Sequence, residues 1–397
     1  MSPDTGARRI DLDWIRIVAF LLLILYHVGM YYVSWDWHVK SPAASSTIEP
    51  LMFLTNPWRL ALLFLVSGVA TAYMLGKLAP GPLARSRSWR LLVPLVFGIV
   101  VIVPPQSYWE VVEKGGYSLD YLEFWGRYLR ADQTFCRGKD CLIVPTWNHL
   151  WFVIYLWFYT MVIAGIVSLA PSWRERWEMR LEGALTGWKL IVVPWLLLAI
   201  VRMALVGRFG STHAFVDDWY NHAQYFLVFS IGFLAARSDS IWAGMERLRW
   251  IALLLAFATW GLLVWYFQLR SGPAVPDSGL RMAQRVVYGL NEWVWIVAIC
   301  GFARRWIKRD SPARRYLTDA IFPFYIVHQT AIILFAIWLR PLAIPPLAEG
   351  LLLIALTAVV CVATYEIVKR VRWLRPLFGL RQRRATSAAS GGIATPG

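Results

Sequence analysis

Residues 11–32 read DLDWIRIVAFLLLILYHVGMYY, an apolar stretch long enough to cross a lipid bilayer. A membrane-spanning helix needs about 20 mainly apolar residues. The sequence contains ten such stretches, which we place at 12–33, 51–75, 91–109, 149–170, 188–206, 222–236, 250–268, 283–303, 316–338 and 347–368. Only 16% of the 397 residues are charged, whereas soluble domains contain about 25%. The sequence therefore predicts an all-α polytopic membrane protein with about ten transmembrane helices, not a soluble enzyme.

The basic residues favour one side of the membrane. The chain has 40 Lys and Arg against 24 Asp and Glu, a net charge of +16, which in a soluble protein would indicate nucleic-acid binding. When the connections between predicted spans are numbered alternately, the set that includes both termini holds 26 of the 40 basic residues and the opposite set holds 11. Cytoplasmic loops retain Lys and Arg. Both termini are therefore predicted to be cytoplasmic, and we expect no nucleic-acid partner.

The segments outside the predicted spans are short. We expect a cytoplasmic N-terminus at 1–11, a single transmembrane domain at 12–370, and a basic cytoplasmic tail at 371–397. From about Ala385 this tail is small, polar and Gly-rich, a composition typical of disorder. The bilayer is thus the main surroundings of the chain.

The longest outer loop, 110–148, contains two cysteines. Cys136 and Cys141 are close enough in sequence to close a small ring, and a disulfide there fits an oxidising compartment outside the cytoplasm. Two free thiols are the alternative. No group of His and Cys has the spacing of a zinc site, so we expect no metal.

Ionisable side chains inside a span cost on the order of 3 kcal/mol each and are functional candidates. Arg16 and His27 lie eleven residues apart in the first span. At 100° and 1.5 Å per residue they share one helix face, with an offset of about 20° and a separation of about 16 Å. A ligand lying along this face would meet a cation and then a titratable imidazole. The alternative is a positive-inside arginine and a buried, hydrogen-bonded histidine.

Three arginines, Arg85, Arg87 and Arg90, precede the third predicted span. Arg87 and Arg90, in ARSRSWRLLVP (84–94), are three residues apart and so lie on one helical face. We place them at the start of a helix, where the helix dipole also attracts anions. Guanidinium groups bind phosphate oxygens in a bidentate way, although arginines that only set topology have the same sequence pattern.

Further candidates lie in three other spans. His149 opens the fourth span in WNHLWFVIYLW (147–157), and FPFYIVHQT (322–330) places Tyr325 and His328 after a proline that kinks the helix. Arg285 and Glu292, seven residues apart in the eighth span, form a candidate buried pair with either a structural or a functional role.

These motifs resemble the membrane-bound acyltransferase-3 family over about residues 12–370. The resemblance is carried by Arg16 and His27 with ten residues between them, by LFLVSGVATAYML (63–75), by Arg87–Ser88–Trp89–Arg90, and by the Tyr-x-x-His ending of FPFYIVHQ (322–329). Within the family, VPPQSYWE (103–110), NHLWFVIYLW (148–157) and FPFYIVHQT are most similar to the glucans biosynthesis protein C branch, which modifies periplasmic glucans.

One motif departs from the family pattern. Many members carry His-x-x-Ser-Leu followed by acidic residues at the start of the fourth span, whereas here Leu150, Trp151 and Phe152 follow His149. No catalytic carboxylate can therefore be carried over to this position.

The resemblance implies an O-acyltransferase of the bacterial inner membrane. It would move an acyl group from cytoplasmic acyl-CoA to a hydroxyl of an extracytoplasmic glycan, for example in succinylation or acetylation of periplasmic glucans, with no permanently bound cofactor. Arg16, Arg87 and Arg90 would bind the anionic end of acyl-CoA. His27 would act as a base or form an acyl-imidazole, and the oxyanion would be stabilised by three further residues, His328, Tyr325 and His149.

A proton-coupled secondary transporter or flippase of an anionic substrate is the alternative on composition alone. In that case His27, Glu292 and His328 would relay protons. The sequence has no visible repeat and no matching pair of broken helices, which transporters often show. The acyl group, the acceptor and the oligomeric state are not determined by the sequence.

Overall fold

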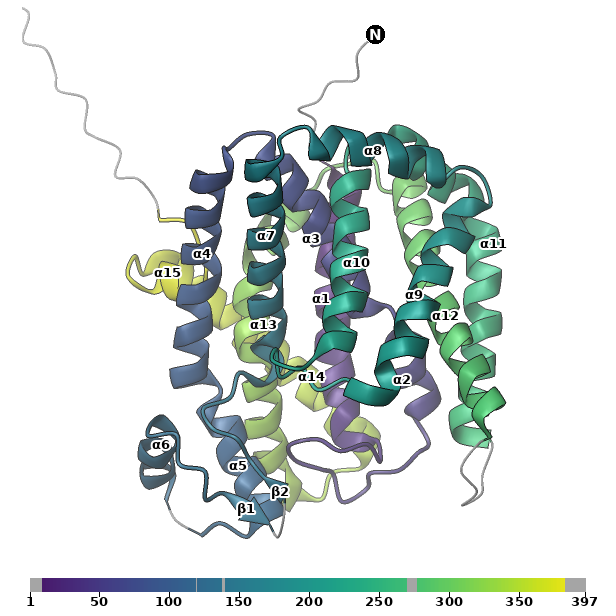
Figure 1. Cartoon of the computed structure of the whole chain (residues 1–397). Helices are drawn as coiled ribbons and strands as arrows, with labels where there is room; N and C mark the ends of the chain where they lie inside the picture. The colour runs from purple at the N-terminus through teal and green to yellow at the C-terminus, as the bar shows by residue number, and fades with distance from the viewer. Residues whose placement is uncertain (1–8, 119, 138–139, 270–276, 383–397) are drawn as a thin grey trace, which may run out of the picture.

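The computed structural model describes residues 9–118, 120–137, 140–269 and 277–382 (Figure 1). Nearly all of its regular structure is helical. In chain order the elements are α1 (Ile10–Tyr32), α2 (Glu49–Thr55), α3 (Arg59–Leu75), α4 (Pro80–Phe97), η1 (Gly98–Ile102), α5 (Pro104–Gly115), α6 (Tyr121–Leu129), β1 (Cys136–Arg137), β2 (Asp140–Cys141), η2 (Asn148–Leu150), α7 (Trp151–Leu169), α8 (Trp173–Ala184), α9 (Lys189–Phe209), α10 (Trp219–Ala235), α11 (Asp239–Val264), η3 (Trp265–Leu269), α12 (Ser278–Trp306), α13 (Pro312–Leu339), η4 (Arg340–Leu342), α14 (Pro346–Arg370) and α15 (Leu374–Leu377).

The helices form the predicted membrane bundle. Within the described ranges, eight helices are long and apolar enough to cross a membrane, and α4 with α5, which bend by 41° at the break between them, can make a ninth. The remaining predicted span, the sixth at 222–236, coincides with α10, which has only 17 residues. Each predicted span therefore corresponds to a helix, whereas the cytoplasmic position of the termini stays a prediction.

Two glycines let α3 and α10 approach each other closely. A Cβ added at Gly68 would lie 2.0 Å from the carbonyl oxygen of Phe229, and one added at Gly232 would lie 2.1 Å from that of Leu65. Small residues at helix contacts allow such close packing in membranes. The LFLVSGVATAYML motif that carries Gly68 thus fixes the position of α3, whose first residue faces the site described below.

Small elements mark the two ends of the bundle (Figure 1). At one end, β1 and β2 pair in antiparallel register next to α5 and α6, and Cys136 and Cys141 form a disulfide across the pair. This is the disulfide considered in the sequence. Three aromatic side chains of the same loop, Phe124, Tyr128 and Phe135, are buried in a small core of their own. At the other end, α8 lies across the helices. Following the predicted topology, we call the disulfide end the outer end and the α8 end the inner end.

Part of the predicted tail belongs to the folded bundle. Phe378 is buried against α4, and Nε of Arg90 donates to the carbonyl of Gly379 at 3.3 Å. The predicted domain boundary at 370 is therefore too early, because apolar side chains interrupt the basic run over 371–380. The stretch from about Ala385, predicted to be disordered, lies outside the described residues, as do residues 1–8.

Candidate functional site

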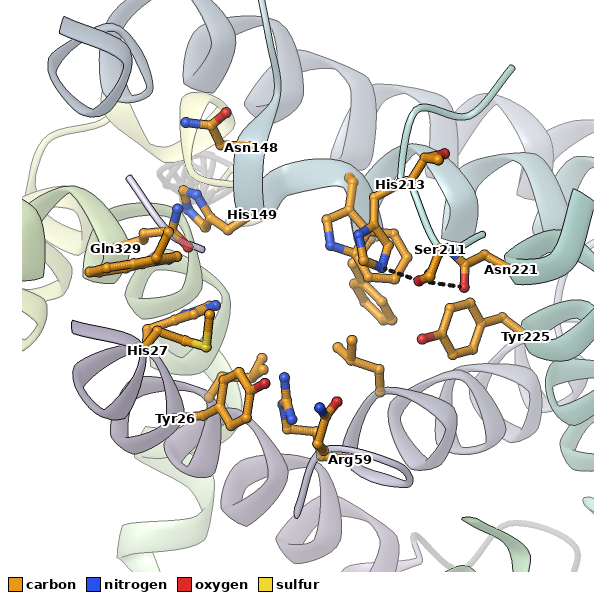
Figure 2. A pocket seen from close by; sticks show the side chains of 18 of the residues that line it. Tyr26, His27, Arg59, Asn148, His149, Ser211, His213, Asn221, Tyr225 and Gln329 are labelled. Atoms are coloured by element: carbon orange, nitrogen blue, oxygen red, sulfur yellow. Dashed lines mark hydrogen bonds between the residues drawn. The ribbon is translucent and has the colours of Figure 1, made fainter. Parts of the chain in front are cut away.

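A cavity of about 610 Å³ lies in the outer half of the bundle (Figure 2). Side chains of α1, α3, α7, α9, α10, α12 and α13 line it, together with the loops at the outer end. Its wall combines aromatic rings with short polar side chains. Among them are Trp37, Trp147, Trp151, Tyr220, Tyr225, Tyr288, Asn148, Ser211, Thr212 and Asn221.

Three histidines from three elements meet at one edge of this cavity. Nδ1 of His27 on α1 lies 2.8 Å from Nε2 of His328 on α13. The ring of His149, in η2, packs edge-on against His328 with centroids 5.1 Å apart. His27 and His149 both line the cavity, whereas His328 is buried behind its wall. The structure thus brings together the three histidines that the sequence singled out in separate spans.

The hydrogen bonds assign the tautomers of the His27–His328 pair. Nδ1 of His328 lies 2.8 Å from the backbone carbonyl of Tyr325, which can only accept, so this nitrogen carries the proton. In neutral His328 the Nε2 atom is then an acceptor, and Nδ1 of His27 must donate to it. Nε2 of neutral His27 therefore keeps its lone pair, and no described residue hydrogen-bonds to it. His27 is the one histidine of the three that can accept a proton from a ligand in the cavity.

The polar protons of His149 and Tyr325 are already bound within the protein. Nε2 of His149 donates to a backbone carbonyl of α13 at 3.1 Å, and the hydroxyl of Tyr325 donates to the backbone carbonyl of His149. The proton of His328 is likewise bound to a carbonyl. In this geometry none of the three can donate to an oxyanion in the cavity without breaking a hydrogen bond that it already makes. Their hydrogen bonds instead hold His27 in position and fix η2 against α13.

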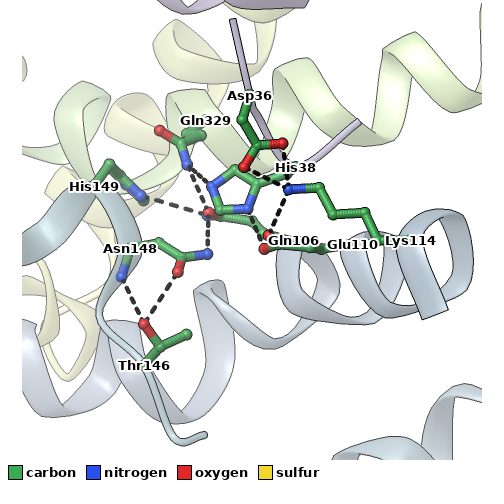
Figure 3. Close-up of polar contacts among 9 residues, drawn as sticks. All are labelled: Asp36, His38, Gln106, Glu110, Lys114, Thr146, Asn148, His149 and Gln329. Carbon is green, nitrogen blue, oxygen red and sulfur yellow. Dashed lines mark hydrogen bonds and ion pairs between the residues drawn. The ribbon is translucent and has the colours of Figure 1, made fainter. Parts of the chain in front are cut away.

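A network of neutral amides surrounds His149 (Figure 3). Oε1 of Gln106 on α5 accepts from Nδ2 of Asn148 and from Nε2 of Gln329, both at 3.0 Å. Nε2 of Gln106 donates to the hydroxyl of Thr330 at 2.6 Å and lies 3.4 Å from Nδ1 of His149. Every polar end of Gln106 is thus used to fix α5, η2 and α13 relative to one another.

The network continues to the outer surface as a chain of charges (Figure 3). Gln329 donates to Nε2 of His38 at 2.9 Å, and Nδ1 of His38 lies 2.5 Å from Glu110. Lys114 then bridges Glu110 at 3.1 Å and the exposed Asp36 at 2.8 Å.

In the part of the chain that the structure describes, no three His, Cys, Asp or Glu side chains lie together in a way that could hold a metal ion.

Two arginines also line the cavity. Arg59, the first residue of α3, lies over the ring of Tyr26, with Cζ 3.3 Å from the ring centroid. Arg202 on α9 donates to the hydroxyl of Tyr220 and lies over the ring of Tyr288 at 3.5 Å. Both are cations in a wall made mainly of aromatic and neutral polar groups, so this part of the cavity is positively charged.

The loop between α9 and α10 forms one side of the cavity. Its backbone is held by Asp218, which accepts hydrogen bonds from the amides of Thr212 and His213 at 3.2 and 3.1 Å and from the hydroxyl of Tyr155. Burial alone would raise the pKa of Asp218, but these bonds and that from Asn221 keep its pKa below the usual value. The ring of His213 stacks on Trp151 at 4.1 Å, and burial lowers its pKa to about 4.

The arginines predicted to bind acyl-CoA lie together near the inner end. Arg16 and Arg90 are both close enough to Arg87 to repel its guanidinium group, whose Nε is buried without a hydrogen-bond partner. Arg16 donates to the carbonyl of Thr318 at 3.2 Å. One part of the prediction is wrong, because α4 begins at Pro80 and places Arg87 about two turns inside the helix. The helix dipole acts only within the first turn.

Aromatic rings separate these arginines from the cavity. Phe20 lies between Arg16 and His27 on α1, and its ring packs against Tyr325 at 5.3 Å and against Phe152 at 6.2 Å. None of the three inner arginines lines the cavity in this structure. We call the contact of Phe20, Tyr325 and Phe152 the aromatic constriction.

The family match covers nearly the whole chain. The acyltransferase-3 family, described as an acyltransferase domain, matches residues 9–366. The chain belongs to this family. Glucans biosynthesis protein C of Escherichia coli (strain 536 / UPEC) is 22% identical to this acyltransferase over 388 residues, covering 95% of the chain and 96% of the relative. A protein of the same name from another Escherichia coli strain is 22% identical over 389 residues, with the same coverage. No solved structure matches significantly. Membership favours an enzyme over the transporter considered above.

Sequence reasoning missed several residues of the acyltransferase site. Arg59 and Arg202 lie inside the predicted spans 51–75 and 188–206, so the rule that selected Arg16 would have selected them too. Gln106 lies in the VPPQSYWE motif but is uncharged. A neutral amide in a short motif gives no signal of the network that it organises.

The predicted pair of Arg285 and Glu292 does not form. Seven residues place the two side chains about 10 Å apart along α12, and Nη1 of Arg285 donates instead to the carbonyl of Met203 at 3.3 Å. Glu292 is buried, and Arg202 is its electrostatic partner. Its Oε1 has no hydrogen-bond partner among the described residues.

Proposed function

We propose that this membrane acyltransferase transfers an acyl group from acyl-CoA to a hydroxyl of a glycan outside the cytoplasm. The nucleotide end of the donor would bind at Arg16, Arg87 and Arg90, and the protein would reside in the bacterial inner membrane. The observation that carries the proposal is the lone pair on Nε2 of His27. It faces the cavity, while the opposite ring nitrogen is bound to His328.

His27 would act as a general base. Its Nε2 takes the proton of the acceptor hydroxyl as the hydroxyl oxygen attacks the thioester carbonyl carbon. The tetrahedral intermediate then collapses, the C–S bond breaks, and the leaving CoA sulfur takes the proton back from Nε2. The products are an ester and CoA, and His27 returns to its neutral form. The reaction balances without a permanently bound cofactor.

The donor would reach His27 along α1. Arg16 and His27 are about 16 Å apart on one helix face, and both contact α13, at Thr318 and at His328. A ligand bound at the inner arginines can therefore extend along this face of α1 towards the cavity. The aromatic constriction lies on this path, so its rings must separate to admit the thioester arm.

The cavity wall supports a carbohydrate acceptor. The ring of Trp147 offers a stacking surface, and Asn148, Ser211 and Asn221 offer hydrogen bonds to hydroxyl groups. The relatives' name, Glucans biosynthesis protein C, supports a glucan as this acceptor. Succinyl and acetyl are the acyl groups to test first.

The decisive experiment measures acyl transfer by purified protein in detergent. Labelled succinyl-CoA or acetyl-CoA is incubated with a β-glucan oligosaccharide, and labelled ester is quantified. His27→Gln should lower kcat by about 10²- to 10⁴-fold, the usual contribution of a general base. His222→Gln is the matched control, because His222 lies outside the cavity wall and bonds to a loop carbonyl. Normal turnover in His27→Gln, or a covalent acyl-His27 trapped during turnover, would overturn the general-base mechanism.

A further inference from the structure

Arg59 is a buried cation for which the described residues supply no anion. Its side chain is 5% exposed, and neither Nε nor Nη1 has a hydrogen-bond partner. Its nearest neighbour is the face of Tyr26, and a cation–π contact leaves the positive charge in place. Burying a charge without an ion partner or hydrogen bonds is strongly unfavourable, so the position is suited to an anionic ligand.

The second arginine of the cavity is different. Arg202 donates to the hydroxyl of Tyr220 and lies over the ring of Tyr288, and the buried carboxyl group of Glu292 lies near it. Asp36 is the one carboxylate among the residues that line the cavity, and it pairs with Lys114 at the outer surface. Neither of these two carboxyl groups therefore compensates the charge of Arg59.

We propose that Arg59 binds a carboxylate that a substrate carries near its reacting group, an inference that rests on the proposed function. Figure 2 shows His27, Tyr26 and Arg59 along one side of the cavity. Arg59 stacks on Tyr26, whose ring centroid is 6.0 Å from that of His27. Because a whole ring lies between Arg59 and His27, the bound anion is a substituent and not the oxyanion formed at the reacting carbonyl.

Two substrates can supply such a carboxylate. The first is a dicarboxylic acyl donor, in which the carboxylate ends the chain that starts at the thioester. The second is an acidic sugar in the glycan acceptor. A guanidinium group binds either one through two parallel N–H···O bonds, and one experiment with two arms separates them.

The donor arm compares succinyl-CoA with butyryl-CoA, which have four acyl carbons each and differ in a terminal carboxylate against a methyl group. With a neutral β-glucan acceptor, Arg59→Met should lower kcat/KM for succinyl-CoA by about 10- to 100-fold, as expected for a lost charge-assisted bond. The kcat/KM for butyryl-CoA should not fall. The matched control is Arg208→Met, which removes an exposed cation of α9 that does not line the cavity.

The acceptor arm repeats the measurement with butyryl-CoA and an oligosaccharide that contains uronic acid. A loss confined to this acceptor supports the site and assigns the carboxylate to the glycan. An equal loss with every donor and acceptor, or no loss at all, would overturn the proposal. If the wild type transfers neither acyl group, the proposed function itself fails.

A folding control accompanies both arms. Melting temperature should not fall in Arg59→Met, because the substitution removes a buried charge without an ion partner. CoA affinity should stay at the wild-type value, because the inner arginines are not part of the cavity wall. Should this variant not fold, Arg59→Lys keeps the charge and loses the planar fork. A fall confined to the carboxylate-bearing substrate would then support the proposal, and an indiscriminate fall would refute it.

Discussion

The hydrogen bond between the two histidines predicts how activity responds to a change at His328. Its Nε2 accepts the Nδ1–H of His27 at 2.8 Å, and its own proton is fixed on the carbonyl of Tyr325. When Nε2 of His27 takes the substrate proton, the ring becomes an imidazolium and this hydrogen bond becomes charge-assisted. His328→Leu removes the acceptor but leaves the base, so it should impair the transition state more than substrate binding.

The size of the effect follows from the change in that bond. A hydrogen bond to a charged group contributes about 1.5–3 kcal/mol, so its loss should lower kcat by about 10- to 150-fold. KM should change little, because His328 is 1% exposed and does not line the cavity. His27→Gln should be more damaging, since it removes the base itself.

The assay compares four variants with the wild type by initial rates of acyl transfer. His328→Gln offers a side-chain oxygen in place of Nε2 and should recover part of the activity lost in His328→Leu. The double variant His27→Gln/His328→Leu should be no slower than His27→Gln alone, because His328 acts only through His27. Melting temperatures in detergent identify any variant that fails to fold.

Two results would refute this reasoning. One is a wild-type kcat in a folded His328→Leu protein. The other is a double variant whose fold-loss in kcat equals the product of the two single losses. Such independent losses would show that His328 does not act through His27.

Three further predictions concern other parts of the molecule. Arg87→Met should weaken CoA binding by about 10- to 150-fold in calorimetry, and unchanged affinity would show that this arginine only sets topology. Phe20→Trp should slow transfer without weakening CoA binding, because a larger ring narrows the aromatic constriction; a normal rate would exclude a donor path through it. Burial lowers the pKa of His213 to about 4 from 6.5, so the unfolded chain takes up the proton first and stability should fall as pH drops through this interval. His213→Gln should reduce that fall in melting temperature, and an unchanged slope would contradict the assignment.

The membrane bundle was largely predictable, because hydropathy reports directly on the thickness of the bilayer. All ten apolar stretches correspond to helices, including α10, which is short. Hydropathy does not report on where a helix begins, however. The polar first turns of α4 and α11 precede their apolar stretches, and this is why Arg87 was misplaced at a helix start.

The charged part of the site was accessible to the same reasoning. Of 40 basic residues, 35 lie outside the predicted spans, and two more, Lys189 and Arg285, lie within two residues of a span end. The three that lie deeper in a span are Arg16, Arg59 and Arg202. The sequence therefore marks all three as unusual. It cannot show that Arg202 has Glu292 near it and that no anion among the described residues accompanies Arg59, because that difference depends on which helices are neighbours.

The neutral network was beyond the reach of the sequence. Gln106 and Asn148 are amides in short motifs, with no charge in an apolar setting to mark them. Their role arises only when α5, η2 and α13 converge on one point. The tautomers of the histidines depend on the same convergence, so the sequence could select His27, His149 and His328 without showing that only His27 is free to accept a proton.

Arg59 and Arg87, for which the described part of the chain supplies no anion, lie on opposite sides of the histidine pair, and their arrangement constrains the donor. Arg87 lies beyond the aromatic constriction on the inner side, and Arg59 lies on the cavity side. A donor with phosphates at one end only would satisfy Arg87 and leave Arg59 buried and uncompensated in the complex. A donor with phosphates at one end and a carboxylate at the other would satisfy both. Selectivity for a dicarboxylic acyl group would then come as much from the cost of seating a neutral chain beside Arg59 as from attraction to the correct one.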